Sequence, residues 1–132
     1  MSYGAAAAVQ VAVYDLLSSA PALAGVMVVD AIAPQAGAGS FVLIGPEEVL
    51  DQSDKSGDGA EHRITISVIS DANGFLTAKG LAAAVSDILV DATPVLSTGR
   101  IVGIRFLKAV AKRLEDGGVR RIDLTFRVRV EL

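Results

Sequence analysis

Residues 120–132 read RRIDLTFRVRVEL, and apolar and polar residues alternate without a break from Ile122 to Leu132. Side chains of a β-strand point alternately to the two faces of a sheet, so this pattern predicts one strand with an apolar face and a charged face. The charged face is rich in arginine, a side chain that favours ion pairs and polar partners. We therefore expect the chain to end inside a sheet that keeps one face available for a contact.

The preceding stretch, Arg100–Leu114, fits either a helix or a strand. A helix would gather apolar residues on one face from Phe106 onward, and the glycines that follow would end it. A strand would alternate from Val102 to Phe106 and turn through residues 115–118 into the last strand. The β-branched residues at its start favour this hairpin. Because residues 108–113 break the alternation, we expect a β-bulge.

Two amphipathic helices are predicted upstream, because apolar residues recur every three or four positions at Gly4–Ser18 and Phe75–Asp91. Three further strands are predicted at Val26–Ile32, Phe41–Ile44 and His62–Ser70. The second of them can continue past Gly45-Pro46 at a sheet edge, where proline is tolerated. The polar segment Asp51–Gly59 is expected to be a mobile loop, disordered in the isolated subunit.

The resulting order, α-β-β-β-α-β-β, predicts a single α+β domain over residues 1–132. We expect two layers, with two main helices packed on one face of a largely antiparallel sheet of four to five strands. The predicted core consists of Val9, Leu16, Leu17, Ile66, Val68, Leu81, Val85, Ile88, Leu89, Leu124, Phe126 and Val128.

Charge is divided unevenly along the chain, whose net charge is −3. Residues 1–54 contain six acids and no Lys, Arg or His, whereas nine of the 12 Lys and Arg lie between Arg100 and Arg129. Folding can bring the acidic and basic parts together, so that no separation of charge remains. Alternatively, it can produce a molecule whose faces carry unlike charge. The second case favours head-to-tail contact between copies or a polyanionic partner.

Side chains for catalysis or for metal and cofactor binding are scarce. There is no cysteine, and the single histidine, His62, is expected to have a surface or interface role at a strand start. Residues 54–59 resemble the first half of a calcium loop, but Thr65 occupies the place of its final Glu. Residues 57–59 precede a strand, so no helix N-terminus is available to hold a phosphate. We expect no enzymatic activity, metal or cofactor.

No stretch reaches the length of a membrane span, and we expect no membrane contact and a cytosol-like compartment. We expect no exposed aromatic residue among the cations of the basic C-terminal part, so the stacking platform on which single-stranded nucleic acids usually bind is not expected there. Sequence-specific binding of nucleic acid is therefore disfavoured.

Three segments together resemble a known family: residues 54–68 (DKSGDGAEHRITISV), the Ala-rich helix with Ala82–Val85 and Asp87, and residues 121–130 (RIDLTFRVRV). They resemble the tail-completion, or tail-terminator, proteins encoded in the neck gene clusters of long-tailed phages, prophages and alphaproteobacterial gene transfer agents. The likeness covers nearly the whole chain, and it is strongest toward the gene transfer agent branch. The specificity lies in the order of the segments rather than in one motif.

This family is similar to the tail terminator of phage lambda, minor tail protein U. The resemblance implies a homo-hexameric ring that caps the tail tube, stops its polymerisation and joins the tail to the head-side stopper, or connector. It implies that DNA passes through the ring without sequence-specific binding. It also implies a place at the tail–neck junction of a virion or phage-like particle, after a stage in the host cytoplasm. It supplies no catalytic residue.

Candidate residues for ring or partner contacts are charged or polar side chains of the segment Asp51–Gly59 and of the strands that follow it. They are Asp51, Asp54, Lys55, Asp58, His62, Arg63, Arg121, Arg127 and Arg129. The alternative function is a small self-assembling ligand-binding α+β domain without catalytic activity, since a fold of this class alone does not decide function.

Overall fold

The computed structural model describes residues 3–30, 39–55, 57–71, 74–114 and 118–132. The elements are α1 (Ala6–Ser18), the 3-10 turn η1 (Pro21–Leu23), β1 (Met27–Val29), β2 (Phe41–Asp51), β3 (Gly59–Ser70), α2 (Leu76–Leu89), β4 (Arg100–Arg113) and β5 (Arg120–Glu131). The sheet has five strands in the order β1-β2-β3-β5-β4. Only β1 and β2 run parallel, and the other neighbours are antiparallel.

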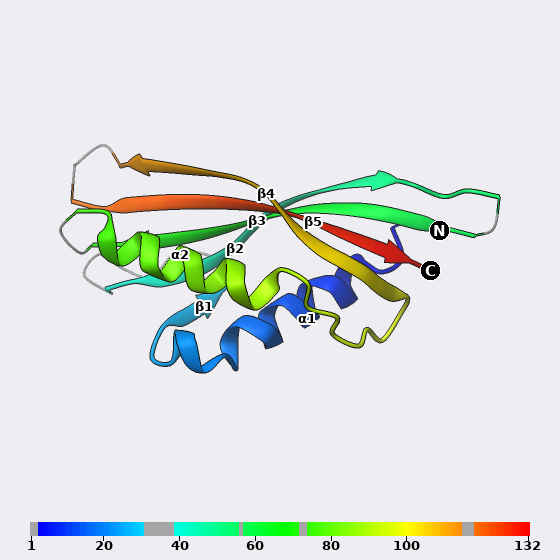
Figure 1. Cartoon of the computed structure of the whole chain (residues 1–132), viewed down its shortest axis with the longest axis horizontal. Coiled ribbons are helices and arrows are strands. Elements are labelled where there is room, and N and C mark those ends of the chain that lie inside the picture. The colour runs from blue at the N-terminus through cyan, green and yellow to red at the C-terminus, as the bar shows by residue number, and fades with distance from the viewer. Residues whose placement is uncertain (1–2, 31–38, 56, 72–73, 115–117) are drawn as a thin grey trace.

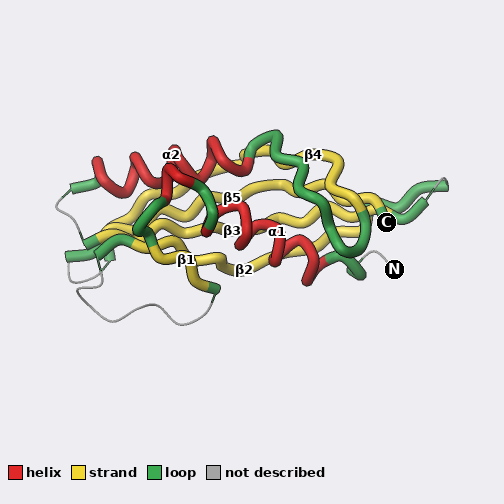
Figure 2. Tube along the Cα trace, turned by 90° about the horizontal axis from the view of Figure 1, so that it is seen from below, coloured by secondary structure: helices red, strands yellow, loops and turns green. Residues whose placement is uncertain are grey.

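Both helices lie on the same face of a long, twisted sheet, as Figures 1 and 2 show from two directions. The predicted α+β fold class, its two layers and its largely antiparallel sheet are confirmed. α1 packs on β1 and on α2, and α2 packs on β3, β5 and β4. Neither of the described helices lies over the opposite face of the sheet, called here the outer face (Figure 1).

Strands β1 and β2 differ from the predicted bounds. β1 ends at Val29, short of the predicted end, although residues 31–32 lie outside the described part of the chain. β2 continues past Gly45-Pro46 to Asp51, and the register with β3 shifts between Ile44 and Glu47. The shift absorbs Pro46, which has no N–H to give to a ladder. β1 pairs only with Phe41–Leu43, so β2 is an edge strand at Pro46, as the sequence predicted for a strand that continues past this proline.

The strand interpretation of residues 100–114 is correct, because β4 and β5 form an antiparallel hairpin. Phe106 pairs with Phe126, and their rings meet edge to face with centroids 6.0 Å apart. A bulge between Phe106 and Lys108 then changes the alternation, and Ala109 comes to lie opposite Leu124. The bulge returns Ala109 and Ala111 to the helix side, where Phe106 also lies, so a pattern that looks broken in the sequence is continuous in space.

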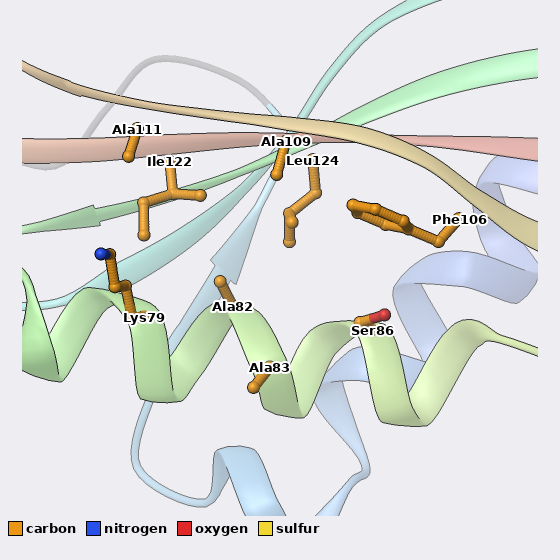
Figure 3. A pocket seen from close by; sticks show the side chains of 9 residues that line it. All are labelled: Lys79, Ala82, Ala83, Ser86, Phe106, Ala109, Ala111, Ile122 and Leu124. Atoms are coloured by element: carbon orange, nitrogen blue, oxygen red, sulfur yellow. The ribbon is translucent and has the colours of Figure 1, made fainter.

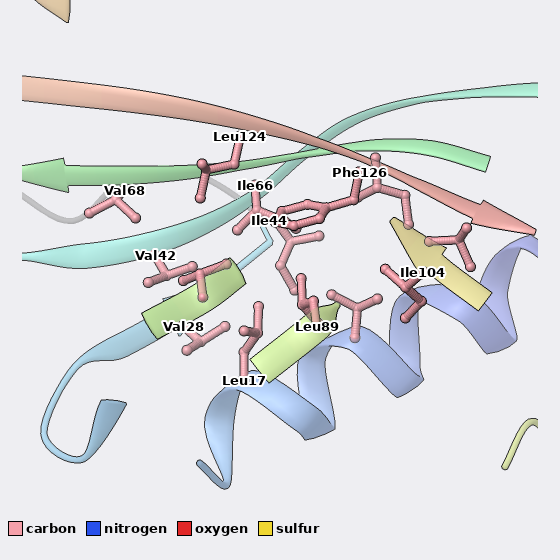
Figure 4. Packing of buried hydrophobic residues seen from close by; sticks show 14 of the residues in the cluster. Leu17, Val28, Val42, Ile44, Ile66, Val68, Leu89, Ile104, Leu124 and Phe126 are labelled. Atoms are coloured by element: carbon pink, nitrogen blue, oxygen red, sulfur yellow. The ribbon is translucent and has the colours of Figure 1, made fainter. Parts of the chain in front are cut away.

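The core lies between the two helices and the sheet (Figure 4). Most of the predicted core residues are buried, and Phe126 is among the largest fully buried side chains. Three of them, Leu16, Leu81 and Ile88, are only partly buried and pack at the margin. Leu132 is 40% exposed, so the apolar face of the last strand ends at Val130, one position earlier than the alternation indicated.

The described residues between β2 and β3 form the end of a hairpin, and the expected mobility of this segment stays a prediction. The Gln52 amide donates to the Gly59 carbonyl oxygen at 2.9 Å, and the Asp54 amide donates to the Gly57 carbonyl oxygen at 2.9 Å. The Leu132 amide donates to the Asp58 carbonyl oxygen at 3.0 Å, which ties the end of β5 to the hairpin. Main-chain hydrogen bonds, which the polar composition does not reveal, thus join the described residues of this segment to one another and to the end of β5.

Candidate functional site

A row of charged residues crosses the outer face of the sheet. Arg63 of β3 pairs with Glu48 of β2 on one side and with Arg127 of β5 on the other, and Arg127 pairs with Arg105 of β4. The row therefore begins with an acid on β2 and ends with three arginines, the last of them on the edge strand. Like charges directly opposite each other are unfavourable unless acids lie between them.

Acidic side chains neutralise two of these three arginines. Glu61 accepts a hydrogen bond from Arg63 Nε at 2.7 Å and lies 3.9 Å from Arg127 Nε. Glu48 lies 3.5 Å from Arg63 Nη1. Arg105 is exposed and makes no ion pair with any residue in the described part of the chain. The candidate residues Arg63 and Arg127 are thus engaged within the subunit, whereas Arg105, which the sequence did not single out, is available.

Arg121 belongs to a second cluster, centred on Asp123. The Asp123 carboxylate accepts hydrogen bonds from Ser67 Oγ at 2.6 Å and Arg121 Nε at 2.7 Å, and Lys112 Nζ lies 3.2 Å away. Burial alone would raise the pKa of Asp123, but the bonds from Ser67, Arg121 and Lys112 together hold that pKa below its ordinary value. This cluster binds β3, β4 and β5 together on the outer face.

The remaining charged candidates gather at the hairpin end of the molecule. Asp51, Asp54, Lys55 and Asp58 are all exposed there. Arg129 donates a hydrogen bond to the Gln52 side chain, so the C-terminal strand reaches the same place. The structure therefore groups Arg129 with the candidate residues of the acidic hairpin, whereas Arg121 belongs to the separate Asp123 cluster.

His62 is not on the surface of the subunit, so the predicted surface position is wrong, while its role at an interface between copies is not tested. β3 begins at Gly59 rather than at His62, and alternation places His62 on the helix face with Ile64 and Ile66. Its side chain is fully buried, and Nδ1 lies 3.2 Å from Glu47 Oε2. Nε2 has no hydrogen-bond partner in the described part of the chain.

The two edges of the sheet carry opposite charge. β4 is the last strand on one side, and its exposed Arg105, Lys108 and Arg113 make no ion pair with a described residue. On the other side, β1 covers only Phe41–Leu43 of β2. The uncovered part of β2 and the neighbouring α1–β1 region carry exposed acids: Asp15, Asp30, Glu48 and Asp51. The charge division in the sequence thus becomes a division between opposite edges.

An apolar groove lies beside the basic edge, between α2 and the β4–β5 hairpin (Figure 3). Its volume is about 330 Å³. Its lining consists of Lys79, Ala82, Ala83 and Ser86 from α2, Phe106, Ala109 and Ala111 from β4, and Ile122 and Leu124 from β5. Small side chains on α2 and β4 leave this space open, and the groove is called here the α2–β4 groove.

Within the described residues, no group of three or more His, Cys, Asp or Glu side chains is placed to hold a metal ion. Among the same residues, no helix is both long and apolar enough to span a membrane. The described residues also form an exposed edge strand, oppositely charged sheet edges and an open apolar groove, which are features typical of surfaces that contact other proteins.

Comparison with known proteins identifies the class. Residues 11–131 match the family model described as tail completion protein gp17, and the chain belongs to this family. It is also similar to a chain in a structure described as the virion of a native gene transfer agent particle. The two share 55% identity with a TM-score of 0.91, over 99% of this chain and 100% of the other. No match was found among curated proteins.

Proposed function

We propose that this protein is a tail terminator: a non-enzymatic component of a phage-like particle or gene transfer agent that closes the tail tube as a hexameric ring. One ring face would bind the last ring of the tail tube, and the other would bind the head-side stopper. DNA would pass through the channel without sequence-specific contacts. Family membership and the similar chain in a gene transfer agent virion support a structural role of this kind.

The observation that carries the ring is the opposite charge of the two sheet edges. A closed ring of identical copies needs two different, mutually complementary surfaces on each copy, because every contact is head to tail. The basic β4 edge and the acidic edge formed by β2, β1 and α1 meet this requirement. Exposed ion pairs contribute only ~0–1 kcal/mol each, so apolar burial must supply most of the affinity.

Termination follows from the unlike ring faces. A terminator must bind the end of the tube more favourably than another tube subunit does, and must then offer no surface on which the tube can grow. The acidic hairpin around Asp54 and Asp58 projects beyond the helices at one end of the long axis (Figure 1). β4 ends at Arg113 and β5 begins at Arg120 at the other end of the long axis (Figure 1). The two ends of each subunit therefore provide different chemistry for two different partners.

The alternative, a small ligand-binding domain, would place its ligand in the α2–β4 groove. That groove is open and lined mainly by alanine and aliphatic side chains, with Lys79 and Ser86 as its polar residues. Small-molecule sites usually combine an enclosed apolar cavity with several convergent polar groups. The groove is therefore better suited to side chains of another protein surface.

Deletion of the gene tests the proposed function. The expected result is filled heads without functional tails, with tail tubes absent, detached or of uncontrolled length in negative-stain micrographs. A plasmid copy of the wild-type gene should restore tailed particles. Normal tailed particles of uniform length from the deletion strain would contradict the proposal, and native mass spectrometry of the purified protein separately tests for six copies.

A further inference from the structure

We infer that the α2–β4 groove of each subunit receives helix α1 of the neighbouring copy. The inference rests on the proposed ring and identifies the apolar contact that holds it together. It concerns two surfaces on different elements of the subunit, an open apolar groove between α2 and the β4–β5 hairpin and the exposed apolar side of α1.

The groove exposes apolar surface that the subunit itself does not cover. The ring of Phe106 packs edge to face on that of Phe126, yet Phe106 is 47% exposed. Ala109 and Ala111 of β4 and Ala83 of α2 are also exposed. In Figure 3 these side chains surround one space, which opens away from the core. An apolar surface of this kind at a sheet edge marks an interaction site.

Helix α1 is apolar on its outer surface as well as on its core surface. Val9, Val13 and Leu17 are buried, while Val11 is 60% exposed and Tyr14 is 43% exposed. Ala7, Val11 and Tyr14 recur at intervals of four and three, so they form one stripe along the helix. A helix on the surface of a monomer ordinarily presents polar residues at these positions. The stripe therefore lacks its partner in the isolated subunit.

The layered arrangement brings the two features together. α1 lies toward the β1 end of the sheet order and α2 toward the β4 end (Figure 2). When the β4 edge of one copy faces the β1–β2 edge of the next, the helix layers also face each other. In this arrangement α2 of the first copy lies next to α1 of the second copy, and the α2–β4 groove of the first copy lies at the contact between them.

Charge supports the same pairing. Asp15 follows Tyr14 on α1 and is exposed, and the groove is bordered by Lys79. The wider surfaces agree, because the edge beside the groove is basic and the edge beside α1 is acidic. Opposite charges steer two copies into one orientation, and the apolar stripe then supplies the buried area.

Disulfide trapping between two single-cysteine variants tests the contact, because the native chain contains no cysteine. Tyr14→Cys protein and Ala83→Cys protein are mixed, assembled and oxidised. Crosslinked dimer is expected in the mixture and not in either protein alone. Gly80→Cys, on the same helix but outside the groove lining, replaces Ala83→Cys as the control and should give no crosslink with Tyr14→Cys.

A second pair of variants tests the same contact without cysteine. Ala83→Arg fills the groove, whereas Gly80→Arg adds the same side chain where, apart from its chain neighbours and the backbone of its own helix, nothing lies within 4 Å of the new Cβ. Ring formation is expected to weaken by about tenfold or more with Ala83→Arg and to be unchanged with Gly80→Arg. Circular dichroism should show both variants folded.

The outcomes separate the inference from the proposed function. A hexameric ring that forms normally with Ala83→Arg, or that gives no Tyr14–Ala83 crosslink, overturns the groove contact and leaves the terminator ring in place. A purified protein that stays monomeric at every concentration overturns the ring as well.

Discussion

Arg105 of β4 lies directly opposite Arg127 of β5 on the outer face of the sheet, and among the described residues only Arg127 of this pair forms an ion pair, with Glu61. Two like charges at paired positions weaken a sheet by some tenths of a kcal/mol unless a counter-charge is present. The unneutralised member of the pair lies on the edge strand. The positive charge of Arg105 therefore destabilises the monomer slightly, whereas the acidic edge of a second copy would neutralise it.

Reversal of that charge should weaken assembly without unfolding the subunit. Arg105→Glu removes the repulsion from Arg127 and adds an attraction, so we expect unchanged or slightly higher stability and several-fold weaker ring formation. Analytical ultracentrifugation measures assembly, and urea unfolding measures stability. Lys55→Glu, with the same charge change at the hairpin end, is the control and should assemble normally if the edge carries the contact. Equal effects of the two variants would contradict the edge model.

Truncation of the central aromatic side chain should cost stability. Phe126 is almost fully buried and contacts Phe106, so Phe126→Ala leaves a large cavity and should lower the free energy of unfolding by ~3–5 kcal/mol. Phe126→Leu keeps most of the volume and should cost less. Chemical denaturation of both variants gives the comparison. Unchanged melting of Phe126→Ala would be incompatible with the register of β5.

The Asp123 cluster predicts a pH dependence of stability. The pKa of Asp123 is lower in the folded protein than its ordinary value near 4, so its ionised form stabilises the fold above that pH. This contribution is lost as the pH falls through the folded-state pKa. Asp123→Asn should reduce stability by ~1–2 kcal/mol at pH 7, and the deficit should shrink below about pH 4. Asp87→Asn, on the exposed surface of α2, is the control. A deficit that is independent of pH would show that the carboxylate charge is irrelevant.

Gly99 should tolerate a side chain much less well than Gly25. Both glycines have positive φ, +78° and +80°, so alanine is conformationally strained at either position. At Gly99 a Cβ would also lie 2.9 Å from the Glu131 carbonyl oxygen, whereas at Gly25 nothing lies within 4 Å. Gly99→Ala should therefore destabilise by ~1–3 kcal/mol more than Gly25→Ala. Thermal unfolding of the two variants measures the difference, and equal losses would mean that the contact with β5 is relieved at no cost.

Local patterns were sufficient for the elements that have a regular period. Residues 122–130 alternate because alternate side chains of β5 face the core and the outer face, and both faces were predicted correctly. The two helices were predicted because their apolar stripes pack on the sheet. Where the period is interrupted after Phe106, the sequence predicted a β-bulge, and the shift in register confirms it. Only the pairing with β5 shows which residues of β4 then return to the helix side.

His62 shows a different limit. Its own residue type favoured the surface, but its place in β3 aligns it with Ile64 and Ile66 on the buried face. Glu47, which lies against it, comes from β2 and becomes its neighbour through the register shift at Pro46. A buried polar pair of this kind depends on strand pairing, so the composition of either segment alone could not identify it.

The sequence by itself determined the fold class, the helices, the alternating last strand and the separation of acidic from basic residues along the chain. These follow from neighbours in the chain, whose side chains recur with the period of a helix or a strand. Only the tertiary structure decided that β5 lies between β3 and β4, which makes basic β4 one edge of the sheet and leaves the acidic segment at the other. It also decided that Phe106 and Ala83 border one open groove. Such placements arise from pairings between segments far apart in the chain, and no local period encodes which strand will be the neighbour of which.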